Sequence, residues 1–276
     1  MAELIRKAAV AGSWYPGDAR AIGTEVGEYL AAAAPPPVVG RLIGLVSPHA
    51  GLRYSGPVAA YGYSLLRGRS ALTAVLVGPS HRVAFRGVAL QARGAFETPL
   101  GRVAIDEPLA ERLLAADPLL SDAPAPHRLE HSLEMQLPFL QHLVPDLRIV
   151  PMLMGSQDRD EIAAVAGALA AALRPQPALL VASSDLSHYH PAAVAGRLDA
   201  LVVGDVERFD AATLQARLER SNEHACGGGP IVAVMTAAAA LGADHARVLR
   251  YADSGDAGER DKSRVVGYLS AALLAS

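Results

Sequence analysis

The segment Ser47-Pro48-His49-Ala50-Gly51-Leu52-Arg53-Tyr54-Ser55-Gly56 (residues 47–56) directly follows a short apolar run, residues 42–46. Such a continuous run is typical of a buried strand. Pro48 should end that strand, because proline cannot donate a hydrogen bond to the sheet ladder. We therefore expect His49 to lie just beyond the carboxyl end of a strand, which is the edge where open α/β sheets bind their ligands.

Two later apolar runs end in a similar way. Residues 73–77 lead into Gly78-Pro79-Ser80-His81, and residues 178–182 lead into a segment that carries Asp185 and His188. Each of these residues alone is typical of a turn cap or a core histidine. Their recurrence at three strand ends predicts one polar cleft.

The composition favours an α/β fold. The chain has 276 residues, enough for a full core, with 51% apolar but only 5% aromatic residues. Such a core is built mainly from Ala, Val and Leu, which suits helices packed on a mostly parallel sheet. Since no solenoid-length repeat and no linker interrupts the chain, we expect a single domain over residues 1–276.

Charge and cysteine content exclude several classes of protein. The net charge of −3 gives no basic footprint for nucleic acid. One cysteine rules out an intramolecular disulfide and fits a reducing compartment. The longest apolar stretch, residues 230–243, is too short to cross a membrane and predicts a buried helix. We expect a cytoplasmic protein with no signal peptide and no membrane contact.

Local patterns predict several helices. Asp18 should cap a helix that runs to about residue 34, and Gly56-Pro57 should open another, with the proline near its first position. In the segment Glu130-His131-Ser132-Leu133-Glu134, helical spacing would place Glu130 and Glu134 on one face. The segment lacks the second histidine of an HExxH zinc motif.

A metal site is the leading interpretation of the reactive residues. His49 and His81 could supply two imidazoles and Cys226 a thiolate, with Cys226 placed at a helix N-terminus where the dipole lowers a thiol pKa. Three ligands leave coordination positions open, as in catalytic sites. The set suits iron, copper or zinc. Asp185 and His188 would orient ligands or form an acid/base pair.

Two alternatives stay open at this point. A Cys226/His pair could act as a nucleophile in a hydrolase, with amides of residues 227–229 as an oxyanion hole. A binding protein could instead use the same cleft for an anionic peptide or small molecule, with Trp14, Arg53 and Tyr54 on the rim.

The motifs resemble those of the Memo family, called AmmeMemoRadiSam system protein B in bacteria, and they keep their order over almost the whole chain. The matching segments are Ser13-Trp14-Tyr15-Pro16, Pro48-His49-Ala50-Gly51 with Tyr54-Ser55-Gly56, Gly78-Pro79-Ser80-His81, Glu97-Thr98-Pro99-Leu100-Gly101, Glu130-His131-Ser132-Leu133-Glu134, Ser183-Ser184-Asp185-Leu186-Ser187-His188, Cys226-Gly227 with Pro230-Ile231, and Val265-Val266-Gly267-Tyr268.

The resemblance implies a fold like that of class III (LigB-type) extradiol dioxygenases, a three-layer α/β/α sandwich around a mixed sheet. It implies one transition-metal ion, iron first and copper or zinc as alternatives, held by His49, His81 and Cys226. In the dioxygenases a carboxylate stands at the cysteine position, and the change to a thiolate alters redox behaviour. Glu130, His131 and His190 are further pocket candidates.

The family also implies ligands and partners. Its members are linked to metal-dependent oxidation and, in animals, to phosphotyrosine-peptide binding. Bacterial members are encoded with a radical-SAM protein and an AMMECR-type protein, which are therefore expected pathway partners. Local departures from the family pattern lie at Leu52 and Arg53 and at Tyr189 and His190, so we expect the rim to differ while the inner ligands are kept.

Overall fold

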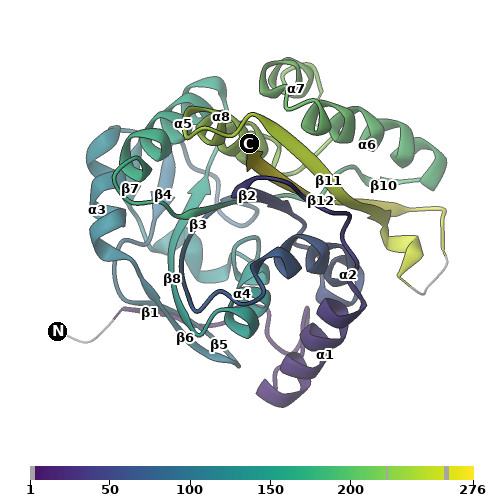
Figure 1. The fold of residues 1–276 in the computed structure, drawn as a ribbon, viewed down its shortest axis with the longest axis horizontal. Helices are drawn as coiled ribbons and strands as arrows, with labels where there is room; N and C mark the ends of the chain where they lie inside the picture. Colours follow the sequence, from purple (N-terminus) through teal and green to yellow (C-terminus); the bar gives the residue numbers. More distant parts are fainter. Residues whose placement is uncertain (1–3, 222, 258–260) are drawn as a thin grey trace.

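A computed structural model describes residues 4–221, 223–257 and 261–276 of the chain. A mixed β-sheet forms its centre, with helices packed on both faces (Figure 1). The expected three-layer α/β/α sandwich is confirmed. The sheet contains six parallel and five antiparallel strand pairs, and its central strands run parallel.

The strands and helices of the described residues have the following bounds. The strands are β1 (Ile5–Arg6), β2 (Arg41–Ser47), β3 (Ala71–Pro79), β4 (Val88–Leu90), β5 (Ala95–Thr98), β6 (Gly101–Ile105), β7 (Leu120–Asp122), β8 (Asp146–Met154), β9 (Leu179–Ser183), β10 (His188–His190), β11 (His245–Asp253) and β12 (Val265–Ala275). The α-helices are α1 (Ala19–Ala32), α2 (Leu52–Tyr63), α3 (Glu107–Ala116), α4 (Leu137–Leu143), α5 (Arg159–Leu173), α6 (Ala192–Glu207), α7 (Ala211–Leu218) and α8 (Gly228–Ala240). The short 3-10 helices are η1 (Ser64–Leu66), η2 (Ala125–Leu129), η3 (Glu134–Gln136) and η4 (Ser254–Asp256).

The strand order places the predicted strand ends side by side. The path through the sheet is β1-β5-β6-β8-β3-β9-β2-β12-β10, with β11 added on β12 and β4 on β8. Strand β9 pairs in parallel with both β2 and β3. In this register Ser47 faces Ser183, and Val77 faces Ala182. The three strands therefore end at nearly the same level.

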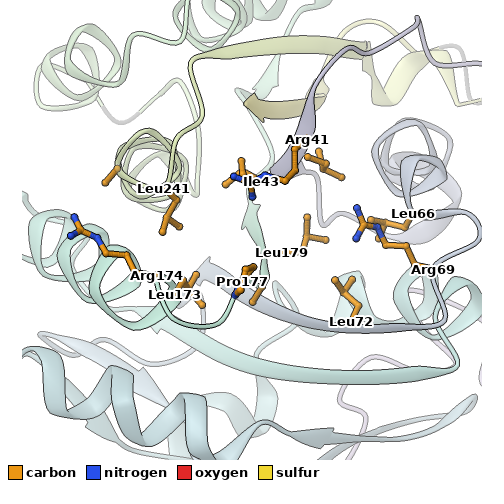
Figure 2. A pocket seen from close by; sticks show the side chains of 13 residues that line it. Arg41, Ile43, Leu66, Arg69, Leu72, Leu173, Arg174, Pro177, Leu179 and Leu241 are labelled. Carbon is orange, nitrogen blue, oxygen red and sulfur yellow. The ribbon is translucent and has the colours of Figure 1, made fainter. Parts of the chain in front are cut away.

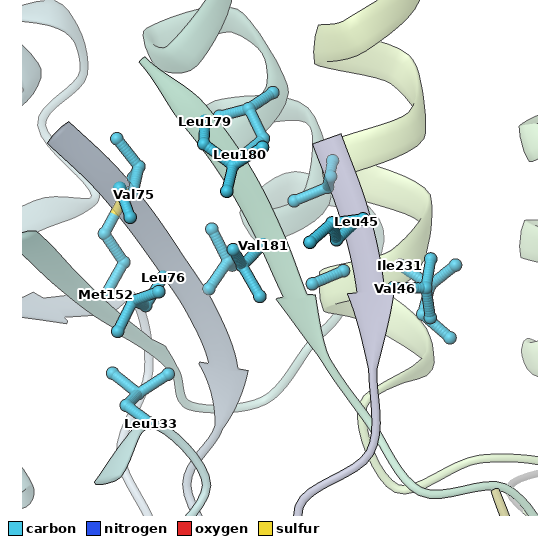
Figure 3. Packing of buried hydrophobic residues seen from close by; sticks show 14 of the residues in the cluster. Leu45, Val46, Val75, Leu76, Leu133, Met152, Leu179, Leu180, Val181 and Ile231 are labelled. Atoms are coloured by element: carbon cyan, nitrogen blue, oxygen red, sulfur yellow. The ribbon is translucent and has the colours of Figure 1, made fainter. Parts of the chain in front are cut away.

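Two helical layers cover the sheet. Helices α1, α2 and α4 pack against one another on one face, and α3, α5 and α8 on the other, with α6 over β11 and β12 (Figure 1). The core between the layers is aliphatic, as Figure 3 shows around Leu45, Leu76, Leu180 and Val181, which have no exposed surface. Burial of each such side chain contributes about 2 kcal/mol to folding.

The apolar stretch 230–243 forms most of helix α8, and the expected buried helix is confirmed. Ten of its thirteen residues are buried, which fits a helix that is apolar on all sides. Nowhere in the described ranges is a helix both long enough and apolar enough to cross a membrane.

Helix α2 begins five residues earlier than the sequence indicated. The expectation of a start at Pro57 was wrong, because the helix starts at Leu52 and contains Pro57. The Leu52 amide donates to the Trp14 carbonyl at 2.8 Å, and the Ser55 hydroxyl donates to Ala50 at 2.8 Å. These contacts fix the first turn directly after His49.

The expected helical face shared by Glu130 and Glu134 is also wrong. Residues 130–133 are not helical. Helical structure begins with η3 at Glu134 and continues into α4. Glu134 accepts hydrogen bonds from Arg6 and from the Tyr15 hydroxyl, whereas Glu130 binds His81. Each buried carboxylate thus bonds to a distant segment, and these long-range contacts override the local helical pattern.

Buried His127 makes stability depend on pH. Its Nε2 donates to the Ala89 carbonyl at 3.0 Å, and burial lowers its pKa to about 4. Because the folded-state pKa lies below the unfolded value, the stability is present above about pH 6.5 and is lost as pH falls toward 4. We expect wild type to lose about 2 kcal/mol more than His127→Gln between about pH 7.5 and pH 5, measured by urea unfolding. Equal losses of unfolding free energy in the two proteins would show that His127 is not the source of the pH dependence.

Candidate metal site

Three side chains from separate segments meet beyond the strand ends. His49 follows β2, His81 follows β3, and Cys226 precedes α8. The Cys226 Sγ lies 3.2 Å from His49 Nε2, and one donor atom from each of the three residues lies within 4.8 Å of the others. Ligand atoms of a tetrahedral ion lie about 3.5 Å apart, so small side-chain movements would let one ion contact all three.

The hydrogen bonds of His49 fix which ring nitrogen faces the other ligand candidates. The Ser183 hydroxyl donates its only proton to the Ser132 carbonyl at 2.7 Å, so it must accept from His49 Nδ1, which lies 2.8 Å away. Gln136 Nε2 also donates to this hydroxyl, at 2.8 Å. His49 Nε2 therefore carries a lone pair, and this nitrogen faces the Cys226 sulfur.

His81 is oriented by a carboxylate. Its Nδ1 lies 2.9 Å from Glu130 Oε1, and its backbone amide donates to Glu130 Oε2 at 2.5 Å. Burial would raise the pKa of Glu130, but the His81 hydrogen bond, the nearby histidines and the Ser132 amide outweigh it and hold this pKa well below its usual range. An ionised Glu130 accepts a hydrogen bond from the Nδ1–H group, which leaves His81 Nε2 as the nitrogen available to a ligand.

Burial keeps two of the ligand candidates, His49 and Cys226, uncharged. It lowers the pKa of His49, with the neighbouring His81 and His131 acting in the same direction. It also raises the pKa of the Cys226 thiol, with the Asp185 charge as the next cause. The expected lowering of this pKa by the helix dipole is therefore wrong for the chain without an ion. The residue as a whole stays partly exposed.

Asp185 holds the backbone of the His49 loop. Its Oδ1 accepts from the His49 amide at 2.7 Å and the Ala50 amide at 3.3 Å. Burial raises its pKa to about 7, while these two bonds oppose the rise. His188 Nδ1 instead lies 2.7 Å from the Leu186 carbonyl, and burial lowers the pKa of His188. Each of the two residues thus bonds to backbone groups; their proton-handling role stays a prediction.

Aromatic rings pack around the ligand candidates. The His131 ring lies 4.6 Å from the His81 ring and 4.2 Å from the Trp14 ring, measured between centroids. Burial lowers the pKa of His131 to about 4. His81, Glu130 and His131 form a second group whose ligand atoms lie within 4.8 Å of one another. The two groups have only His81 in common.

Two cavities open beside the site. One, of about 510 Å³, is lined by His81, Cys226, His188 and His190 among others. The second, of about 420 Å³, is lined by residues that include Trp14, Arg53, Tyr54 and Arg264. Tyr189 lines both cavities, is 63% exposed and has a φ of 63°. The predicted rim residues Trp14, Arg53 and Tyr54 therefore lie together in one cavity, and Tyr189 lines both this cavity and the one beside His81 and Cys226.

Sequence reasoning missed two residues that position the ligands. Ser183 ends β9, and its place at a strand end was a signal that could have identified it. Gln157 gave no local signal in the sequence. Its Nε2 donates to the Cys226 carbonyl at 2.9 Å, and its Oε1 accepts from the Gly229 amide at 3.0 Å, so the side chain holds the backbone on both sides of Gly227. These two bonds offset the strain of its left-handed backbone, which has a φ of 55°.

Because Cys226 is the only cysteine, its alkylation reports on this clamp. Slow reaction with iodoacetamide is expected in wild type, since the pKa of the buried thiol is raised. Gln157→Ala removes two hydrogen bonds and should speed alkylation roughly tenfold, as local opening becomes more populated. Mass spectrometry of the whole protein over time measures the rate.

The matched control is Gln176→Ala, whose side chain accepts from Arg112 on the surface. This variant should react at the wild-type rate. Equal rates for Gln157→Ala and wild type would show that Gln157 does not restrain the cysteine.

Comparisons with known proteins show which family the chain resembles. A family profile described as Memo-like protein matches residues 6–272. A MEMO1 family protein from Methanothermobacter thermautotrophicus is 37% identical over 274 residues, covering 96% of this chain and 99% of the relative. Another, from Methanocaldococcus jannaschii, is 37% identical over 283 residues, covering 97% and 98%.

A solved structure shares the fold. The crystal structure of an uncharacterized protein from Escherichia coli K12 covers 83% of this chain and 99% of its own, with a TM-score of 0.54 and 17% identity. At that identity the likeness concerns the fold alone. The family profile and the archaeal relatives confirm the resemblance read from the motifs, and this chain belongs to the Memo-like protein family.

Proposed function

We propose that this chain is a metal-dependent redox protein in which His49, His81 and Cys226 hold one transition-metal ion. The observation that supports it best is the hydrogen bonding of the two histidines. Each ring uses Nδ1 for a fixed acceptor, Ser183 for His49 and Glu130 for His81. Nε2 is then the nitrogen available to a metal, and that of His49 already contacts the Cys226 sulfur at 3.2 Å. Metal-binding histidines are commonly oriented in this way.

The ligand atoms limit which metal ions the site would bind. Two imidazoles and one thiolate suit iron, copper or zinc, and of these we propose iron first. Since His81 and Cys226 line the cavity of about 510 Å³, a substrate could approach the open coordination positions from that side. A bound redox metal would supply electron transfer at the end of this cavity.

Two further polar residues, Asp185 and His188, support the site without binding the metal. Asp185 fixes the His49 loop through two backbone amides. His188 lines the same cavity as the metal candidates, and a neutral imidazole there can accept or donate a proton to a substrate. We propose this proton-handling role for His188 together with Asp185, three residues before it in the chain.

A radical-SAM protein remains the pathway partner that we propose.

The alternatives receive different support. A hydrolase would need a Cys226 thiolate beside a protonated His49, and burial disfavours both charged forms. A binding protein for a small anion or a phosphopeptide is favoured by the second cavity, where Arg53 and Trp14 lie on the wall. That reading predicts ligand affinity that survives chelation of the metal.

Metal content tests the proposal. Protein purified anaerobically with reductant should hold nearly one iron or copper per chain, measured by elemental analysis. His49→Ala and Cys226→Ser should each lose the metal, because two remaining ligands bind far more weakly than three. His142→Ala, an exposed histidine on α4, should keep it. A metal-free wild type after reconstitution would overturn the proposal.

The Glu130 carboxylate offers a second test with an intact ligand set. Glu130→Gln removes the negative charge that orients His81 and should weaken metal affinity by about 10- to 100-fold. Competition with a chromophoric chelator measures this affinity. The matched control is Glu111→Gln on the exposed side of α3, for which no change is expected. Unchanged affinity in Glu130→Gln would show that the carboxylate does not support a ligand.

A further inference from the structure

A separate cavity lies at the opposite edge of the sheet. Its wall includes the first residues of β2 and β9 together with the C-terminal ends of α5 and α8 (Figure 2). Strand β2 runs from this cavity at Arg41 to the edge beside His49, a distance of about 20 Å along the strand. The cavity is therefore distinct from the metal candidates and from the two cavities beside them.

The floor of this cavity is apolar. Figure 2 shows aliphatic side chains between the surrounding arginines. Those lining the floor are Leu42, Ile43, Leu66, Leu72, Leu173, Leu179 and Leu241. The cavity volume of about 390 Å³ lies within the range of small-molecule sites. A ligand with an apolar body would remove this surface from water.

Three arginines surround the apolar floor, and no acidic residue lines the cavity. In the described part of the chain, the guanidinium groups of Arg41, Arg69 and Arg174 have no hydrogen-bond or ion-pair partner, whereas the surface residue Arg159 is bound by Glu219. Arg174 is the C-cap residue directly after α5, where the helix dipole favours a cation. Arg41 and Arg69 have no such explanation.

The three guanidinium groups therefore have no counter-charge among the residues that form the cavity. Asp146, whose amide donates to the Ser70 carbonyl at 3.1 Å beside Arg69, does not line the cavity. An unpaired cation beside an apolar floor fits a ligand that carries both an acidic group and a hydrophobic part.

We propose that this cavity binds an amphiphilic anion, a small molecule with a carboxylate or phosphate head and a compact apolar body. The head group lies between Arg41 and Arg69, and the body lies on the leucine floor. This site is independent of the metal site and of the proposed redox function.

Three eight-carbon probes test whether binding to the cavity requires a negative charge: octanoate, octyl phosphate and neutral 1-octanol. Chemical shifts of labelled leucine and isoleucine methyl groups report binding at the floor. One or both anions should shift the floor methyls saturably and bind about fivefold more tightly than 1-octanol, as expected for exposed charge pairs. The stronger anion identifies the head group. Equal affinity for 1-octanol, or no shifts at the floor, would overturn the proposal.

Charge variants locate the head group. Arg41→Gln and Arg69→Gln change exposed side chains, so the fold should be kept, and together they should remove the preference for the anion. Arg247→Gln, on the exposed side of β11 and outside the cavity, is the control and should bind as wild type does. An undiminished preference in the double variant would contradict the placement. Metal content should be unchanged in the double variant and in the control.

Discussion

The parallel pairing of β9 with both β2 and β3 is the constraint on which the site depends. It brings Ser47 opposite Ser183, and Val77 opposite Ala182, so segments far apart in the sequence end at one level of the sheet. Proline residues 48 and 79 stand at or just after two of these ends. The backbone therefore leaves the ladder where the histidines begin, and their rings can approach the helix start that carries Cys226.

Much of this arrangement could be predicted, because the signals are local. An apolar run followed by proline and histidine marks a strand end, and helix α8 could be recognised from its continuous apolar stretch. The contacts of Glu130 and Glu134 could not be predicted from helical spacing, since each carboxylate is bound by a residue at least 49 positions away. Gln157 was missed for the same reason: its partners lie 69 and 72 positions along the chain.

The electrostatic balance of the site follows from burial. Low-polarity surroundings keep His49 and the Cys226 thiol neutral, while Glu130 stays ionised because His81 and two backbone amides satisfy it. A positive ion in this place would be favoured by a fixed carboxylate behind one ligand, and it would compete with a proton on the sulfur. Affinity at such a site rises with pH as that proton is given up.

The position of β12 has a consequence for how the chain folds during synthesis. Strand β12 lies between β2 and β11 and pairs with both, yet Val265 follows Ser47 by 218 residues (265 minus 47). On the ribosome, β2 therefore keeps one unpaired edge until almost all of the intervening chain has been made. An exposed edge of this kind can pair with other chains, so the late synthesis of β12 leaves the sheet open to wrong pairing for most of the time that the chain is being made.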